Sequence, residues 1–257
     1  MMSEQSRNAP PPPSDEAASM SLIDHLVELR RRLVRASIGV IIGMGFGIFL
    51  VMGPFKLVDL LITTFAPLTD RPPVQSVGTT EEFTSYMTVA LAIGVVLAMP
   101  VIVYQLLAFI VPALTQRERR IIFIALPFVI LFFLAGIAFG WFITVPTAIR
   151  FLVGFSGSEL IESQPALSNF ITTVTVLLLI NGIVFELPVI IYVLAFLGVV
   201  TSKQLASYRR FAIVGVTIVA AFITPTGDPI NLALLAIPMY FLYELGIILA
   251  RFVPKRD

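Results

Sequence analysis

Long runs of apolar residues alternate with short polar segments along the chain. Six runs stand out, at Leu33–Met52, Met87–Leu107, Ile121–Phe142, Asn169–Leu197, Phe211–Ile223 and Ile230–Leu249. A helix of about 20 apolar residues is long enough to cross the hydrocarbon core of a bilayer, and it satisfies its own backbone hydrogen bonds there. The pattern therefore predicts an all-α, polytopic integral membrane protein with six transmembrane helices.

The last two of these helices are predicted to be short. Phe211–Ile223 would be about 20 Å long as a helix, against a hydrocarbon core of about 30 Å. Pro238 interrupts the sixth run, and its apolar part before Glu244 is also short. We expect both helices to span a locally thinned bilayer, since thinning relieves a mismatch of this kind. A re-entrant hairpin is the alternative.

The basic residues are distributed unevenly between the two sides of the predicted membrane. When the gaps between runs are assigned to alternate sides, only three of the 17 Lys and Arg residues fall on one side, at Lys56, Arg71 and Arg150. The other fourteen share the side that holds both chain ends. By the positive-inside rule that side is the cytoplasm. We therefore expect a multi-pass protein of the cytoplasmic (inner) membrane with both termini cytoplasmic.

The two ends of the chain differ from its central part. Residues 1–20 are polar, include the run Pro10–Pro13, and are predicted to be a disordered cytoplasmic tail. Ser21 is a candidate helix N-cap, after which a helix is expected to lie along the membrane surface and then turn into the first span. Residues 21–250 form the predicted membrane domain, and residues 251–257 form a basic cytoplasmic tail.

Prolines and glycines predict where the helices bend and where they pack closely. Prolines inside the apolar runs, at Pro100, Pro127, Pro188 and Pro238, are each expected to kink a helix and to free a carbonyl group. Glycines recur every four residues in the first and third runs, at Gly39, Gly43, Gly47, Gly136 and Gly140. Such faces let helices approach closely, either within this chain, which we favour, or against a partner.

Three polar side chains are predicted to lie inside the membrane. Glu186 is deep in the fourth run with Asn181 before it, and Glu244 is near the end of the sixth run. A charged acid at mid-span costs about 3 kcal/mol on insertion scales, so such residues usually face a cavity or a partner. Glu186 either has a functional role or forms a neutral hydrogen bond to a carbonyl that Pro188 frees. Glu244 either has such a role or reaches the membrane interface.

Composition excludes several classes of protein. Hydrophobic residues make up 58% of the chain and charged residues 13%, whereas soluble domains contain about 25% charged residues. The chain has no cysteine and one histidine, His25, which precedes the first run. It therefore has no candidate thiolate or two-histidine metal site and no intramembrane Ser–His pair, and it has no P-loop. We expect no enzyme activity, no cofactor or metal, and no nucleic-acid binding.

Several short motifs occur in a fixed order along the chain. The first is H-L-V-E-L-R-R-R-L at His25–Leu33. The others lie at Pro100–Gln105, Ala108–Leu114, Glu118–Arg120, Phe185–Pro188, Thr224–Asp228 and Tyr243–Glu244. Each motif is weak alone, but in this order on a six-span chain they resemble the TatC family, the polytopic core of the twin-arginine protein translocase. The resemblance covers residues 21–250.

The resemblance implies a function and a set of partners. TatC-like proteins bind signal peptides that carry paired arginines. With small single-span partners of the TatA and TatB types, they carry folded proteins across the membrane using the proton-motive force, and the protein is expected to associate with itself. The residues implied to bind the signal peptide are Glu28, Arg30, Phe109 and Glu118. The residues implied to lie in outer-face loops are Pro67, Phe83 and Asp228.

The chemistry of carboxylates agrees with this implication. Guanidinium is planar and pairs bidentately with carboxylate, which distinguishes Arg from Lys by geometry as well as by charge. Outside the spans, the ordered part of the predicted cytoplasmic surface offers Asp24, Glu28 and Glu118 as acids. The alternative is that Glu28 pairs with Arg32, four residues on, and that Glu118 pairs with Arg35 or with a loop arginine.

Two other classes of function are weighed against this one. A proton-coupled small-solute secondary transporter would use Glu186 and Glu244 as its coupling groups. Such transporters usually contain repeated halves, and residues 21–143 show no repeat in residues 169–250. A scaffold without a ligand would leave Glu28 and Glu118 unexplained.

Overall fold

The computed structural model of the chain describes residues 16–68, 74–76, 78–110, 116–154, 165–224 and 228–253, without the side chains of residues 16–25, 68, 107, 108, 110, 116–125, 153 and 154. Residues 1–15 of the predicted disordered tail lie outside the described residues, as do residues 254–257 of the predicted basic tail. The predicted tail boundary at residue 20 falls inside a helix, because α1 begins at Glu16.

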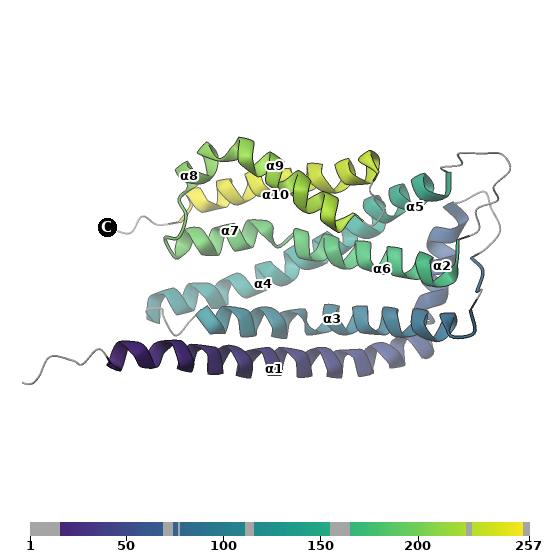
Figure 1. The fold of residues 1–257 in the computed structure, drawn as a ribbon, viewed down its shortest axis with the longest axis horizontal. Coiled ribbons are helices and arrows are strands. Elements are labelled where there is room, and N and C mark those ends of the chain that lie inside the picture. The colour runs from purple at the N-terminus through teal and green to yellow at the C-terminus, as the bar shows by residue number, and fades with distance from the viewer. Residues whose placement is uncertain are drawn as a thin grey trace, which may run out of the picture.

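The described residues form a bundle of helices (Figure 1). In chain order the elements are α1 (Glu16–Met52), α2 (Leu57–Phe65), a 3₁₀ turn (Ala66–Leu68), α3 (Glu81–Ile110), α4 (Gln116–Phe139), a π-helical turn (Gly140–Thr144), α5 (Val145–Gly154), α6 (Leu167–Val184), α7 (Leu187–Phe196), α8 (Ser202–Ser207), α9 (Arg209–Ile223) and α10 (Pro229–Arg251). One isolated bridge joins Gln75 to Ala166. The all-α class predicted from the sequence is confirmed.

Five helical segments are long and apolar enough to cross a membrane. They are Leu26–Met52, Glu81–Leu106, Leu126–Leu152, Leu167–Phe196 and Pro229–Arg251. Helix α9 has 15 residues and falls below the length of a full span. The prediction that the last helix is also short is wrong. Helix α10 has 23 residues because it continues through Pro238 and Glu244 as far as Arg251.

Helix α1 is a single helix, whereas the sequence predicted a surface helix that turns into the first span. Its 37 residues run without interruption from Glu16 to Met52, and Figure 1 shows them as one straight rod. No proline lies within this range, and its first glycine is Gly39. Leu, Arg and Glu, which favour helix, fill the segment where the turn was expected, so nothing in the sequence breaks the backbone there.

Glycines bring α1 and α3 into close contact. A β-carbon at residue 43 would lie 2.6 Å from the carbonyl oxygen of Gly94, and a β-carbon at residue 47 would collide with the carbonyl oxygen of Ala90. Gly39 faces Val101 farther along the same interface. The glycine repeat of the first run therefore packs within the chain, as favoured from the sequence.

The third predicted span is longer than its apolar run. Helices α4 and α5 are joined by the π-helical turn Gly140–Thr144, so the helix continues past Phe142 to Gly154. Gly136 and Gly140 pack against Asn181 of α6, which again places a glycine pair at an intramolecular contact. This contact fixes α4 against the middle of the fourth span.

The fourth span is broken in its middle. Helix α6 ends at Val184, Phe185 and Glu186 form a turn, and α7 begins at Leu187. Pro188 occupies the first turn of α7, where its missing N–H costs least and where it cannot bond to the Val184 carbonyl. Helix α7 then packs against α10, and Gly246 admits the Ile191 side chain at that interface.

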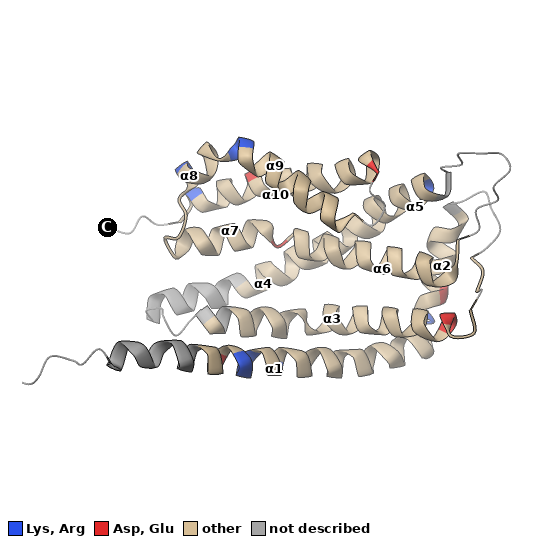
Figure 2. Cartoon of the chain, in the orientation of Figure 1, with Lys and Arg blue, Asp and Glu red and all other residues tan. Residues whose placement is uncertain are grey.

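The helices lie roughly antiparallel, so that the bundle has two ends (Figure 1). We call them the α8 end, which also holds the first turns of α1 and the last turn of α10, and the α2 end, where α2 lies across the bundle. Charged residues gather toward these two ends, and most of the length between them is uncharged (Figure 2). Helix α9 packs chiefly against α10, and within α9 only Ala220 is buried.

Candidate functional site

The residues implied to bind a signal peptide come from elements that meet at the α8 end. Glu28 and Arg30 lie in the first half of α1, Phe109 in the last turn of α3, and Glu118 in the first turn of α4. The side chain of Glu118 lies outside the described part of the chain. Helix α3 packs against both α1 and α4, so three separate segments converge there.

Glu28 forms an ion pair within α1. The Arg32 guanidinium donates to the Glu28 carboxylate through Nε at 3.1 Å and through a terminal nitrogen at 2.5 Å. The alternative pairing considered from the sequence is therefore present for Glu28. The two side chains are partly exposed, and an exposed pair at this helical spacing contributes only about 0.3–0.5 kcal/mol. A guanidinium group arriving from outside can therefore compete for the carboxylate at low cost.

Glu186 is buried at the break between α6 and α7. It is 6% exposed, and its Oε1 atom has no hydrogen-bond partner among the described residues. The predicted hydrogen bond to a freed carbonyl is therefore not seen at this oxygen. The ring of Phe185, the preceding residue, lies 5.3 Å from that of Phe139. Glu186 is thus enclosed where α4 and α6 meet.

Glu244 belongs to a polar cluster that joins α9 to α10. The Arg209 guanidinium donates to both carboxylate oxygens, at 2.7 and 2.8 Å, and the Tyr240 hydroxyl donates at 2.9 Å. Nearby, the Tyr243 hydroxyl donates to the Leu205 carbonyl oxygen of α8 at 2.8 Å. The sequence identified the acid but not its partner, which lies 35 residues away.

Hydrogen bonds within the protein hold the Asn181 side chain in place. The Thr144 hydroxyl donates to Asn181 Oδ1 at 3.2 Å, and Asn181 Nδ2 donates to the Leu177 carbonyl oxygen at 2.8 Å. Both side chains are at most 2% exposed. The pair ties the π-helical turn to α6, so Asn181 pairs with Thr144 and not with the acid of the same span.

The three residues implied to lie in outer-face loops are all at the α2 end, in different settings. Pro67 is exposed within the 3₁₀ turn after α2. Phe83 lies in the first turn of α3 and not in a loop, with 63% of its surface exposed. Asp228 is the N-cap of α10, where its carboxylate accepts from the Asn231 backbone N–H at 2.7 Å. Phe83 and Asp228 therefore lie at helix N-termini, and Pro67 lies in a turn.

A buried acid that sequence reasoning missed joins two spans at the α2 end. Glu81, 8% exposed, accepts hydrogen bonds from the Ser168 backbone N–H at 2.8 Å, the Ser168 hydroxyl at 2.9 Å and the Gly78 N–H at 3.1 Å. It thus links the starts of α3 and α6. The feature of the sequence that could have identified Glu81 is its position at the start of a helix, directly after Gly78-Thr79-Thr80.

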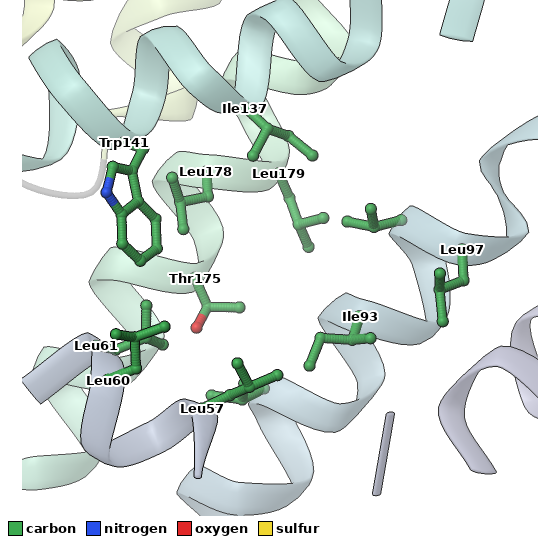
Figure 3. Close-up of a pocket in the computed structure, with 12 residues that line it drawn as sticks. Leu57, Leu60, Leu61, Ile93, Leu97, Ile137, Trp141, Thr175, Leu178 and Leu179 are labelled. Carbon is green, nitrogen blue, oxygen red and sulfur yellow. The ribbon is translucent and has the colours of Figure 1, made fainter. Parts of the chain in front are cut away.

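An apolar cavity of about 220 Å³ lies under α2, between α3, α4 and α6. Leu57, Leu60 and Leu61 cover one side of it, and Trp141 covers another (Figure 3). The Thr175 hydroxyl points into this space (Figure 3) and has no hydrogen-bond partner among the described residues. The Trp141 ring also packs edge-on against Phe65, with centroids 4.9 Å apart. The cavity therefore lies beside α2, whose Val58, Leu61 and Phe65 pack directly against the neighbouring helices.

The fold and its surface define a class of protein. Large apolar side chains are exposed along the spans, among them Ile41 and Ile42 of α1 and Phe222 of α9, where only lipid or another apolar surface can cover them. The chain is a multi-pass helical membrane protein. The family model described as Sec-independent protein translocase protein (TatC) matches residues 24–238. The chain belongs to the TatC family.

Proteins of known name and structure show the same relationship. The chain is 39% identical to the Sec-independent protein translocase protein TatC of Deinococcus radiodurans over 96% of its length and 91% of the relative's. It is 36% identical to the Aquifex aeolicus protein of the same name, over 92% and 97%. A crystal structure of the twin-arginine translocase receptor TatC has a TM-score of 0.76 and 34% identity, and the match covers 90% of this chain and all of that one.

Proposed function

We propose that the chain is the signal-peptide receptor and core subunit of a twin-arginine, Sec-independent protein translocase. Membership of the TatC family, together with the similarity to a solved twin-arginine translocase receptor, is the observation that carries the proposal. Glu28 and Glu118 are the proposed acceptors for the paired arginines, with Arg30 and Phe109 beside them. The convergence of α1, α3 and α4 at the α8 end supports this assignment.

The proposed partners follow from the family. They are signal peptides of folded substrate proteins, small single-span subunits of the TatA and TatB types, and further copies of this chain. The proton-motive force would drive transport through the assembly. The rival function, a proton-coupled solute transporter, is less favoured, because Glu244, one of its two coupling groups, is held by Arg209 and Tyr240.

The proposed topology places the α8 end in the cytoplasm and the α2 end outside the cytoplasmic membrane. The proposed membrane part is residues 21–250, and the family model matches residues 24–238 within it. In this topology α9 is a sixth, short span, and α10 returns the chain to the cytoplasm. The Arg209–Glu244 pair supports the arrangement, because it places charged groups of both helices at the α8 end.

Single cysteines test this topology, since the chain has none of its own. A thiol reagent that cannot cross the membrane should label Thr226→Cys and Glu159→Cys from outside intact cells. It should label Ser207→Cys only after the membrane is opened. Thr226→Cys that is protected from both sides would show a re-entrant hairpin, and Glu159→Cys that is labelled only from inside would overturn the six-span arrangement.

Peptide binding tests the proposed receptor site. Charge-assisted hydrogen bonds contribute about 1.5–3 kcal/mol each, so Glu28→Ala and Glu118→Ala should each weaken binding of an Arg-Arg signal peptide about tenfold or more. Fluorescence anisotropy of a labelled peptide would measure this on purified full-length protein. The wild type should prefer the Arg-Arg peptide over a Lys-Lys peptide, and either substitution should reduce that preference.

Arg32 offers a matched control for Glu28. Because Arg32 occupies the Glu28 carboxylate in the unbound chain, Arg32→Gln should free it and strengthen peptide binding about twofold. The same change should leave binding unaltered if Glu28 only stabilises α1. An unchanged preference for Arg-Arg in the Glu28→Ala, Glu118→Ala double variant would place recognition elsewhere.

A further inference from the structure

A second pocket lies at the α8 end, away from the proposed peptide site. It has a volume of about 470 Å³, is open on one side, and is lined by the end of α7, the start of α8 and the end of α10. Gly198, with φ 76°, ends α7 by turning the chain in the left-handed region that favours glycine. Thr201 then begins α8 with a capping box formed with Gln204. The turn at Gly198 and the capping box of Thr201 and Gln204 therefore determine the shape of the pocket.

The inner wall of the pocket is apolar. Ala195 and Ala250, from facing positions on α7 and α10, are 9% and 6% exposed. Phe196 and Val253 extend this wall toward the end of the bundle. Because these residues end two helices that are long enough to cross a membrane, the wall lies where the bilayer core gives way to its polar surface.

The outer rim of the pocket is basic. Lys203 and Arg251 both line it and both are exposed, and neither forms an ion pair with any residue that the structure describes. The nearest acid in sequence, Glu244, is already held by Arg209. Figure 2 shows basic residues of α8, α9 and α10 gathered at this corner of the bundle. The Ser202 hydroxyl, also on the rim, is a further hydrogen-bond donor.

The carbonyl groups at the C-terminus of α7 do not use Lys203 or Arg251 as hydrogen-bond donors. The Gly198 N–H donates to the Ala195 carbonyl oxygen, and the Val199 N–H donates to that of Leu194, both at 3.0 Å. The end of α7 is therefore capped by its own backbone. Lys203 and Arg251 keep their donors for a ligand.

We propose that this pocket binds the phosphate headgroup of an anionic phospholipid, with Lys203 and Arg251 on the phosphate and an acyl chain against the apolar wall. A basic rim next to an apolar wall at the membrane boundary matches the two parts of such a lipid. A free phosphate ion would use the rim but not the wall, so the lipid is the occupant that the whole pocket fits. The site is separate from the proposed peptide site, and each can be lost without the other.

The test titrates detergent-purified full-length protein with phosphatidylglycerol, phosphatidylcholine or inorganic phosphate and counts bound molecules by native mass spectrometry. The site variant is K203Q/R251Q. The control variant is K56Q/R150Q, which removes the same charge from exposed positions at the α2 end. Near a membrane surface each cation contributes enough that losing two should weaken phosphatidylglycerol binding about 30-fold. K56Q/R150Q should bind phosphatidylglycerol like the wild type.

Each result either supports the site or overturns it. Loss of phosphatidylglycerol binding in K203Q/R251Q alone, with weaker phosphatidylcholine binding to the wild type, supports it. Equal phosphatidylglycerol binding by K203Q/R251Q and the wild type overturns it, as does equal affinity for the two lipids. Displacement of phosphatidylglycerol by millimolar inorganic phosphate would show a simple anion site. Peptide affinity measured on the same samples keeps this outcome separate from that of the receptor proposal.

Discussion

Replacing Gly43 with valine should force α1 away from α3. A β-carbon at this position would lie 2.6 Å from the Gly94 carbonyl oxygen, and a backbone atom cannot rotate out of the way. Overpacking of this kind costs about 1–3 kcal/mol, which corresponds to a fall of about 2–12 °C in the unfolding temperature of a protein of this size. The fluorescence of Trp141, the single tryptophan, would follow unfolding in detergent.

Gly45 provides the matched control on the same helix. A β-carbon there would have no heavy atom within 4 Å, so Gly45→Val makes the same change in a site that faces outward. Its unfolding temperature should stay at or above that of the wild type, because valine favours helix more than glycine does. Equal destabilisation by Gly43→Val and Gly45→Val would mean that contact with α3 does not decide the effect.

Glu81→Ala should destabilise the α2 end. The change removes the acceptor for the backbone N–H groups of Ser168 and Gly78 and for the Ser168 hydroxyl. A buried donor left without a partner costs about 1–3 kcal/mol, so we expect a fall of about 2–12 °C in the unfolding temperature. Trp141 fluorescence again reports the transition, since this residue lies at the same end of the bundle.

Two variants separate this hydrogen-bonding role from loss of charge. Glu82→Ala removes an exposed acid from the next position and should leave the unfolding temperature unchanged. Glu81→Gln keeps one oxygen for Ser168 but not the acceptor for Gly78, and it should fall between Glu81→Ala and the wild type. If Glu81→Ala behaves like Glu82→Ala, the acid does not join α3 to α6.

The spans could be predicted from the sequence because the bilayer imposes their length and composition. Helix ends were harder to predict, since hydropathy does not record where an apolar helix continues into a polar one. The third span continues beyond Phe142 through a π-helical turn, and α10 continues past Glu244. Pro188 marks a real break, whereas the helices run through Pro100, Pro127 and Pro238. A membrane helix tolerates a proline where neighbouring groups satisfy the carbonyl that has lost its N–H donor.

Partners that are distant in sequence could not be predicted. Glu244 was recognised as an acid near a membrane boundary, but only the fold shows that α9 brings Arg209 to it. Glu81 and Ser168 are 87 residues apart, and no local pattern joins them. The choice of Glu28 and Glu118 came from the family resemblance, and the fold shows that the Arg32 pairing weighed for Glu28 from the sequence is present.

The dependence of α9 on α10 has a consequence for how the protein is made. Ribosomes release α9 before α10, so the 15-residue helix leaves the synthesis machinery before the helix that it packs against. Until Glu244 emerges, Arg209 lacks the carboxylate that it binds in the folded protein. Packing of α9 is therefore completed only after α10 has been made, so that a later helix fixes an earlier one.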